Sequence, residues 1–393
     1  MPMERVTVVG GSLAGLRAAQ ELRAEGFDGS IRIVAAEDHL PVDRPPMSKQ
    51  LLAGTWEPDR ALLRGTDDVA AEWILGRRAT ALDPATRRVT LDDATTVDGD
   101  GVVIATGASP RRLPTHVIPP DMSGVHELRT LADCLTIRAD FARAGRIVVI
   151  GAGFIGGEVA ATARALGLEV TVLEALPIPL ERALGSEMGR LCGQLHIDHG
   201  VDLRCDAGVE RLVADGSGRV ASVALADGTF VECDVVVVGV GVLPATSWLE
   251  GSGLTLGDGL VCDDRCRAAP GIVAAGDVAR WYHQGLGTEI RVEHWTNAAE
   301  QGAAAARALL HGDAAPPYRP IPYFWSDQHG TKIQFVGHRR TGDTVEVVEG
   351  STDDAKFVAV YATEGRISGA LLWNRPSRVA HWSDMVARSF APS

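Results

Sequence analysis

The segment from Arg146 to Glu174 constrains the fold most, because it reads as a strand, a glycine turn, a helix and a second strand in succession. Residues 147–150 are a short β-branched run, which predicts a buried strand. Apolar residues then recur at helical intervals as far as Gly167, and a second apolar strand follows over 170–173. This order of elements is the context in which a glycine-rich turn indicates dinucleotide binding.

Three glycines and one acidic residue give that turn its chemistry. Gly151 allows a tight turn, Gly153 lets a pyrophosphate approach the backbone, and Gly156 lets the helix pack closely on the strand. The helix N-terminus offers free N–H groups and a partial positive charge to phosphates. Glu174 can accept hydrogen bonds from a ribose and favours a 2′-hydroxyl over a 2′-phosphate, so the unit predicts an NADH site rather than a turn that binds nothing.

A second copy of the unit occupies residues 4–37. Gly10, Ser12 and Gly15 take the three fingerprint positions, so a serine replaces the middle glycine, and Glu37 takes the position of the ribose acceptor. Two such units in one chain predict that the protein holds two dinucleotides and passes electrons between them. A duplicated fold with one inactive site is the alternative.

These units predict an α/β protein with two Rossmann-like domains. The strand at 101–104 ends in Ala-Thr-Gly and marks the crossing into the second domain, and the apolar strand after Cys233 marks the return. Alternating residues after Pro317 predict a small antiparallel sheet that a helix over 376–390 closes. We therefore expect a discontinuous FAD-binding domain (1–110 and 238–315), an NAD-binding domain (111–237) and an α+β C-terminal domain (316–393).

Composition excludes several classes of function. A formal charge of −13 over 393 residues argues against non-specific nucleic-acid binding. The first strand begins by Val6, which leaves no room for a secretory signal, and the longest apolar run is too short to span a bilayer. The six cysteines are scattered without a C-x-x-C pair. We expect a cytoplasmic protein with free thiols, no metal site and no membrane contact.

The segment from Pro41 to Gly54 follows the first unit. Pro45 and Pro46 stiffen it, and Ser48 is predicted to cap a short helix. Lys49 comes just after the ribose acceptor, where a cation can stabilise the charge that develops on a reduced flavin. A solvated surface lysine is equally consistent with the sequence alone.

Other positions carry weaker signals. Leu128-Arg129-Thr130 is predicted to open a helix that continues to Ala144. The strand after Gly271 ends at Asp277, which suits either a ribityl hydroxyl or an ordinary helix cap, and a long helix is expected from Thr296. Arg182 can meet a phosphate or lie on the surface. The run Tyr323-Phe324-Trp325, taken by itself, is interpreted as core.

The chain resembles, nearly end to end, the flavoprotein ferredoxin reductases of oxygenase systems, the putidaredoxin reductase and biphenyl-dioxygenase reductase group. More loosely it resembles the glutathione reductase superfamily. The specific motifs are RPPMSK (residues 44–49) and FWSDQ (324–328). The wider superfamily shares the motifs IATG (104–107), LRTL (128–131), GAGFIGGEVA (151–160) and AAGD (274–277).

The resemblance implies roles for individual residues. Lys49 corresponds to the family's flavin-side lysine, Glu158 to its carboxylate partner, and Trp325 to an aromatic residue near the nicotinamide. Ala35-Ala36-Glu37 departs from the family's usual Gly-Asp-Glu or Gly-Asp-Ala, as Ser12 does from glycine. The residues expected at FAD are Gly10, Ser12, Ala14, Gly15, Glu37, Arg44, Lys49, Ala79, Thr106, Gly107, Arg129, Gly276, Asp277 and Trp295. Those expected at NADH are Gly151, Gly153, Ile155, Gly156, Glu174 and Arg182, with Gly241 assigned to cofactor binding at the return crossing.

The resemblance also implies the reaction, hydride transfer from NADH to FAD and then single-electron transfer to an iron–sulfur ferredoxin that feeds a monooxygenase or dioxygenase. The ferredoxin contact is expected to be transient, and Arg77, Arg78, Arg339 and Arg340 are candidates to attract an acidic partner or are simply solvated. A monomer or a homodimer is expected. A disulfide or peroxide reductase would need a cysteine near Lys49, and none precedes Cys134. A rubredoxin reductase, or a signalling flavoprotein like apoptosis-inducing factor, remains the alternative.

Overall fold

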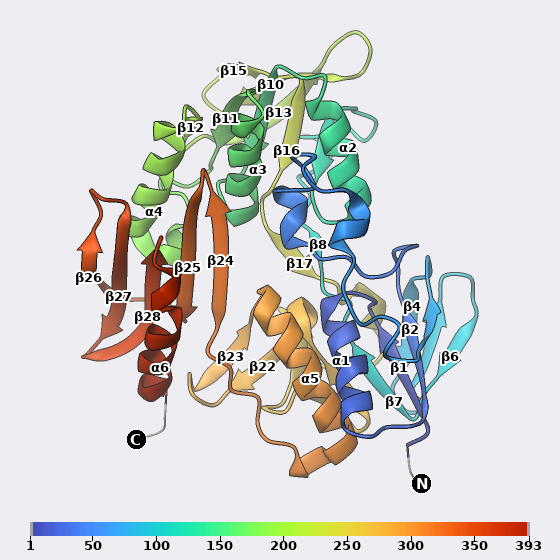
Figure 1. The fold of residues 1–393 in the computed structure, drawn as a ribbon. Helices are drawn as coiled ribbons and strands as arrows, with labels where there is room; N and C mark the ends of the chain where they lie inside the picture. The colour runs from blue at the N-terminus through green and yellow to red at the C-terminus, as the bar shows by residue number, and fades with distance from the viewer. Residues whose placement is uncertain (1–2, 391–393) are drawn as a thin grey trace.

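The computed structural model of the chain describes residues 3–390. Two α/β units, each with a parallel-strand core, and one antiparallel sheet make up its architecture (Figure 1). The antiparallel sheet lies alongside both α/β units, because β24 contacts helix α3 of one and helix α5 of the other. Every part of the predicted α/β class with a small C-terminal α+β unit is therefore present.

The first α/β unit contains the N-terminal fingerprint. Buried β-branched strand β1 pairs in parallel with β2 and β7, as expected for a strand covered on both faces. Helix α1 packs against the long alanine-rich helix α5, where small side chains allow close approach. The sheet, in spatial order, contains β20 (Arg267–Ala269), β21 (Ile272–Ala274), β7 (Gly101–Ile104), β1 (Arg5–Val9), β2 (Ser30–Val34) and β3 (Glu72–Ile74), and its helices are α1 (Leu13–Ala24) and α5 (Trp295–His311).

Two small sheets and several single turns of 3₁₀ helix complete this unit. The first small sheet contains β4 (Ala79–Asp83), β5 (Arg88–Leu91) and β6 (Thr96–Asp98), and the second contains β18 (Leu256–Gly257), β19 (Gly259–Cys262), β22 (Ala279–His283) and β23 (Thr288–Arg291). The 3₁₀ turns are η1 (Pro45–Ser48), η2 (Pro58–Ala61), η3 (Ser247–Leu249), η4 (Gly276–Val278) and η5 (Gly312–Ala314).

The second α/β unit repeats the design with the central fingerprint. Its strand β10 pairs in parallel with β11 and β16, just as β1 pairs with β2 and β7. The sheet contains β12 (Asp202–Arg204), β11 (Glu169–Leu173), β10 (Arg146–Ile150), β16 (Val235–Val238) and β9 (Val125–Glu127). The helices are α2 (Leu131–Phe141), α3 (Phe154–Ala165) and α4 (Glu181–Asp198), and the hairpin sheet contains β13 (Val209–Ala214), β14 (Val220–Leu225) and β15 (Phe230–Glu232).

The two crossings between the α/β units lie side by side. Strand β8 (Ala108–Pro110) leaves the first unit, strand β17 (Val242–Pro244) returns to it, and the two pair in an antiparallel ribbon. The predicted crossing points after Gly107 and after Val238 are thus one structural feature.

The C-terminal unit is a five-stranded antiparallel sheet with a helix on one face. Apolar residues alternate along its strands, and helix α6 covers the face that carries Val336 and Leu372. The sheet contains β24 (Tyr323–Gln328), β25 (Thr331–Gly337), β28 (Arg366–Trp373), β27 (Lys356–Thr363) and β26 (Thr344–Ser351), followed by η6 (Pro376–Arg378) and α6 (Val379–Phe390).

Three local predictions were wrong. Helix α2 begins after its Thr130 cap as expected but ends at Phe141, short of Ala144. Ser48 does not cap a helix; it is the last residue of η1, and its hydroxyl contacts a carboxylate instead. Asp277 lies in one 3₁₀ turn that leads into strand β22 rather than into a helix, because residues 279–283 pair with β19 and β23; its carboxylate accepts from Arg129.

None of the helices between residues 3 and 390 combines the length and the apolar character that crossing a bilayer requires.

Candidate functional site

The first fingerprint forms a tight backbone turn at the start of α1. Gly10 has φ +119°, and a Cβ there would lie 2.0 Å from the carbonyl oxygen of Ala105, at the end of β7. A Cβ on Gly15 would lie 2.0 Å from the carbonyl oxygen of Gly10. Ser12 stands at the N-cap of α1 without a side-chain capping hydrogen bond, so the first N–H groups of the helix have no side-chain partner from it.

The second fingerprint reproduces this geometry at the start of α3. Gly151 has φ +104° and fits against the carbonyl oxygen of Gly239 at the end of β16, while Gly156 fits against the carbonyl oxygen of Gly151. No atom lies within 4 Å of the position where a Cβ of Gly153 would stand, and α3 has no side-chain cap. The space and the free N–H groups suit a pyrophosphate at this turn.

The two acidic residues at the strand ends have different partners. Glu174 accepts hydrogen bonds from the backbone N–H groups of Ala152 and Leu176, at 2.8 and 2.9 Å, which ties it to the fingerprint turn. Glu37 instead lies 3.3 Å from the Arg44 guanidinium and 3.6 Å from His39. Burial and the neighbouring charge of Arg129 lower the pKa of Arg44 to about 10, so Arg44 remains cationic at neutral pH.

A second set of polar groups meets beside the first fingerprint. Arg129 donates to Asp277 at 2.8 Å, and the pair joins the segment just before α2 of the second unit to η4 of the first. Gly276 stands next to Ala14, where a Cβ on the glycine would lie 3.1 Å from that of the alanine. Among residues 3–390, the buried Nε of Arg129 and Nδ1 of His294 have no hydrogen-bond partner. These donors and the open turn fit a dinucleotide such as FAD.

Lys49 and Glu158 form the polar centre at the junction of the three units. Their side chains are 15% and 4% exposed, and the Lys49 ammonium donates to Glu158 Oε2 at 2.7 Å. Ser48 Oγ donates to the same oxygen at 2.5 Å, and Ser326 Oγ donates to Oε1 at 2.7 Å. The structure thus brings Lys49 and Glu158 together, and the two serines are partners that the sequence did not reveal.

Aromatic residues adjoin this centre from β24 and α5. The Trp325 ring lies 6.1 Å from that of Trp295, and the Trp295 indole N–H donates to Asp43 at 2.7 Å. Burial raises the pKa of Asp43 despite that bond. Phe324 packs in the core against Phe335, as interpreted from the sequence, whereas Trp325 does not belong to that core cluster.

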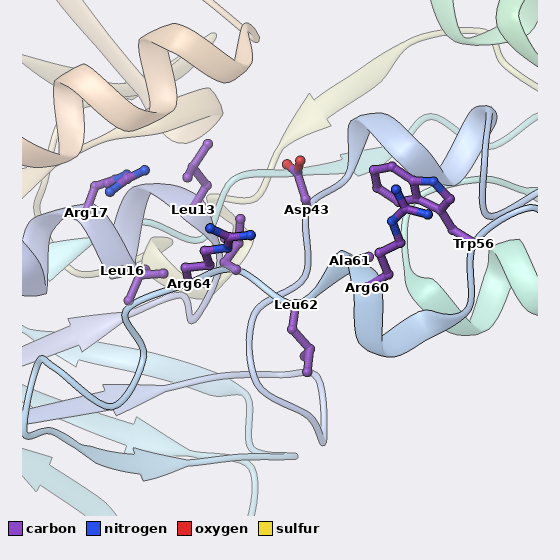
Figure 2. A pocket seen from close by; sticks show the side chains of 10 residues that line it. Leu13, Leu16, Arg17, Asp43, Trp56, Arg60, Ala61, Leu62 and Arg64 are labelled. Carbon is purple, nitrogen blue, oxygen red and sulfur yellow. The ribbon is translucent and has the colours of Figure 1, made fainter.

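A cavity of about 320 Å³ opens beside the first fingerprint. Figure 2 shows Asp43 between the start of α1, with Leu13, and the Trp56 and Arg60 side chains, whose guanidinium lies 4.3 Å from the indole ring. Arg17 and Arg64 line the same cavity, so its walls are cationic and it adjoins the first fingerprint rather than the Lys49–Glu158 pair.

A larger cavity, of about 470 Å³, reaches the polar centre from the other side. The residues that line it include Lys49, Thr162, His199, Asp327 and His329. Solvent can therefore approach Lys49 through this cavity, while Glu158 stays buried.

The cysteines take no part in the site. All six are free; five are buried and Cys205 is half-buried. The thiol closest to the Lys49 segment, Cys134, donates to the backbone carbonyl of Met47, and burial raises the pKa of Cys134 to about 11. A thiol so placed is protonated at neutral pH, which argues against disulfide chemistry beside Lys49.

The remaining predicted residues lie at three places in the structure. Thr106 and Gly107 bond to Ala245 and so hold the two crossings together, near the open turn at Gly241. Ile155, 51% exposed in the first turn of α3, and Arg182, exposed at the start of α4, lie on the second unit. Ala79 begins β4 and has no hydrogen-bonding side chain.

Comparison with known proteins places the chain among flavoprotein reductases. Residues 4–302 match the family described as pyridine nucleotide-disulphide oxidoreductase, and residues 323–393 match the reductase C-terminal family. The chain is 37% identical to rhodocoxin reductase of Rhodococcus erythropolis over 377 residues, covering 94% of this chain and 86% of that protein. It is 38% identical over 398 residues to the ferredoxin–NAD(+) reductase component of the anthranilate 1,2-dioxygenase system of Burkholderia cepacia, covering 100% and 96%.

A solved structure shows the same fold. The covalent putidaredoxin reductase–putidaredoxin complex superposes with a TM-score of 0.94 at 32% identity, over 99% of this chain and 94% of that chain.

Proposed function

The chain belongs to the pyridine nucleotide-disulphide oxidoreductase family, and from that premise we propose that it is an FAD-dependent ferredoxin–NAD(+) reductase of an oxygenase system. It takes a hydride from NADH and delivers single electrons to an iron–sulfur ferredoxin. The observation that supports this most directly is the arrangement of two dinucleotide turns around one buried Lys49–Glu158 pair with no ionisable thiol beside it.

The bound flavin supplies the chemistry that accepts electrons in a pair and releases them singly. The chain's own residues bind and orient the two dinucleotides. Glu174 holds the ribose of NADH, and the Lys49 ammonium faces the flavin site, where its positive charge stabilises the negative charge gained on reduction. Trp325, beside Trp295, shapes the space for the nicotinamide and limits the access of water.

We propose the residue assignments from the sequence as the two binding sites. In this proposal the FAD-binding domain comprises residues 1–110 and 238–315, the NAD-binding domain 111–237 and the C-terminal domain 316–393. The separate sheets and the β8–β17 ribbon support these boundaries.

The electron acceptor in this proposal is a ferredoxin rather than a rubredoxin or a signalling partner. Relatives named as ferredoxin reductase components, and the complex of putidaredoxin reductase with putidaredoxin, support it. Surface arginines provide the attraction for an acidic partner: Arg78 is exposed, whereas Arg77 is already paired with Asp93. The six free cysteines support a reducing, cytoplasmic location.

Stopped-flow spectroscopy tests the proposal. Mixing the FAD-loaded protein with NADH should bleach the flavin absorbance in well under a second, and adding an oxidised ferredoxin should restore it. Alkylation of the cysteines should leave both phases unchanged. A flavin that NADH does not bleach, or a reaction that alkylation abolishes, would contradict the proposal.

A further inference from the structure

A chain of hydrogen bonds leads away from Glu158 to the surface. Ser326 Oγ, which donates to Glu158 Oε1, accepts from the Gln328 amide nitrogen at 3.0 Å. The Gln328 carbonyl oxygen lies 3.0 Å from His196 Nε2, and His196 Nδ1 lies 3.0 Å from His329 Nε2. His329 lines the cavity that also contains Lys49.

The direction of every bond in this chain follows from two premises, that Glu158 is ionised and that both histidines are neutral. A carboxylate only accepts, so Ser326 must donate to it and must receive its own hydrogen bond from the Gln328 amide. The Gln328 oxygen then accepts from His196 Nε2–H, which leaves His196 Nδ1 as an acceptor for His329 Nε2–H. Both histidines are thereby fixed as neutral Nε2–H tautomers.

The chain joins parts of the molecule that are distant in sequence. Glu158 and His196 lie on α3 and α4 of the second unit, Ser326, Gln328 and His329 lie on β24 and the turn after it, and Lys49 belongs to the first unit. Gly157 leaves room for the hydrogen-bond chain, because a Cβ at this position would lie 3.0 Å from both Gln328 amide atoms and from His196 Nε2. A glycine inside a helix costs about 1 kcal/mol relative to alanine, so this position favours the polar chain over helix stability.

The surroundings keep the histidines neutral. His196 is 6% exposed, and burial lowers its pKa to about 4. Burial also lowers the pKa of His329 to about 3, with further lowering by His196, His199 and Arg164. The charged and titratable groups that face this pair are His199 of α4, Arg164 of α3 and, beyond Ser326, the Glu158–Lys49 pair.

We infer that Ser326, Gln328, His196 and His329 are positioning residues that hold the Glu158 carboxylate ionised and in one orientation. They thereby set the charge that the Lys49–Glu158 pair presents to the flavin site. An ionised Glu158 cancels the charge of Lys49, whereas a protonated Glu158 leaves a net positive charge beside the flavin. The effect on the flavin rests on the proposed function, whereas the hydrogen-bond chain does not depend on it. The three histidines are not a metal site: among residues 3–390 no group of three or more His, Cys, Asp or Glu side chains is arranged to hold an ion.

The first test follows the midpoint potential of the bound flavin from pH 5 to pH 8 by spectroelectrochemistry, which needs neither NADH nor ferredoxin. Ser326→Ala removes one donor to the carboxylate and so disfavours its negative charge. At the acid end of this range the potential should exceed that of the wild type, because a larger net positive charge beside the flavin favours its reduced form.

Three variants separate positioning from bulk structure. His196→Asn keeps an acceptor near the Nδ1 position but loses the Nε2–H donor, and should change the potential in the same direction as Ser326→Ala but by less. His196→Gln places an amide donor near the Nε2 position and should restore the wild-type curve. Gln194→Asn alters an exposed side chain of the same helix whose amide donates to Asp198 instead of to the hydrogen-bond chain, and should change nothing.

The second test does not depend on the flavin. In ¹⁵N-imidazole-labelled protein, His196 and His329 should both appear as Nε2–H tautomers that do not titrate above pH 5. A Nδ1–H tautomer on His196, or identical potential curves for Ser326→Ala and wild type, would overturn the inference. If NADH failed to reduce the flavin of the wild-type protein, the proposed function would be refuted. The tautomers of His196 and His329 would still decide whether the hydrogen-bond chain runs as described.

Discussion

Helices α1 and α3 begin with the same turn and end in different surroundings. In both helices, the first glycine of the fingerprint fits against a backbone carbonyl just after a parallel strand, β7 or β16. The third glycine fits against the carbonyl oxygen of the first. Two residues after the third glycine, α1 carries Arg17 at the surface cavity, whereas α3 carries the buried Glu158. Helix α1 is covered by α5 of its own unit, and α3 by η1 of the first unit and β24 of the third.

The two turns therefore differ in their surroundings: the first is suited to binding a cofactor, and the helix after the second carries a residue of the Lys49–Glu158 pair. The first turn, closed within one unit by small side chains, is suited to holding a cofactor permanently; a Cβ on Gly302 of α5 would lie 2.4 Å from the Ala14 carbonyl oxygen. The second turn is open at Gly153, and its helix supplies a charged residue to the place where the three units meet.

The largest effect should come from filling the third glycine of each turn. Gly15→Ala should yield a colourless protein with at least a 100-fold loss of FAD affinity, since a backbone clash of this kind costs about 3 kcal/mol. Gly156→Ala should leave the protein yellow and weaken NADH binding by a similar factor. Absorbance of the bound flavin and titration with NADH measure the two outcomes.

Gly216→Ala is the matched control, because no atom lies within 4 Å of its added Cβ and it belongs to neither turn. If Gly15→Ala and Gly156→Ala affected the same cofactor, the two turns would not have separate ligands.

The next effect concerns the two residues that follow the turns. Glu158→Gln keeps the shape of the side chain and removes its charge, so the charge of Lys49 is no longer cancelled and flavin reduction by NADH should speed up about 30-fold, or about 2 kcal/mol. Arg17→Gln, at the matching position of α1, should leave the rate unchanged. Stopped-flow bleaching of the flavin measures both, and an equal change in the two variants would remove the distinction between the helices.

Much of this contrast could be predicted from sequence, because local patterns determine it. The two strand–turn–helix units follow from β-branched runs and glycine spacing, which depend on backbone conformation and burial over a few residues. The small antiparallel sheet of the C-terminal unit followed from the alternation of apolar and polar residues, but the number of its strands did not. The pairing of Lys49 with Glu158 was expected only from the family resemblance, since 109 positions separate the two residues.

The polar chain could not be predicted, because tertiary packing alone brings its members together. His196 and Gln328 are 132 positions apart, and neither carries a spacing signal. Ser48 was interpreted as a helix cap because caps are the common local role of serine, yet its hydroxyl bonds to a residue from another unit. One signal was available: Gly157, a helix glycine that the fingerprint does not require.

Acid should weaken the surroundings of α3 through His196. The folded-state pKa of His196 is about 4 and its unfolded value is about 6.5, so the unfolded state binds more protons between these values. The full stability is present above pH 6.5 and is lost as the pH falls toward 4, and the loss at pH 5 is about 2 kcal/mol. Hydrogen exchange should show α4 and β24 losing protection at pH 5 in the wild type and keeping it in His196→Asn. The start of α5, where burial also lowers the pKa of His294 to about 4, should lose protection in both proteins. A loss of protection in α4 and β24 that His196→Asn does not reduce would count against this role.

The smallest effect should come from the acidic residues at the strand ends. Glu174→Ala with Ala175→Arg removes the ribose acceptor and adds a partner for a 2′-phosphate, so preference should move from NADH toward NADPH. Because Glu174 also accepts from two backbone N–H groups of its own turn, its loss loosens that turn and limits the gain, and we expect a shift of about tenfold or less. Steady-state kcat/KM with each nucleotide measures the change. Glu37→Ala is the counterpart in the first unit; its partner is Arg44, so the substitution should weaken FAD retention and leave the nucleotide preference as it was. An unchanged NADH preference in the double variant would mean that residues other than Glu174 discriminate between the two nucleotides.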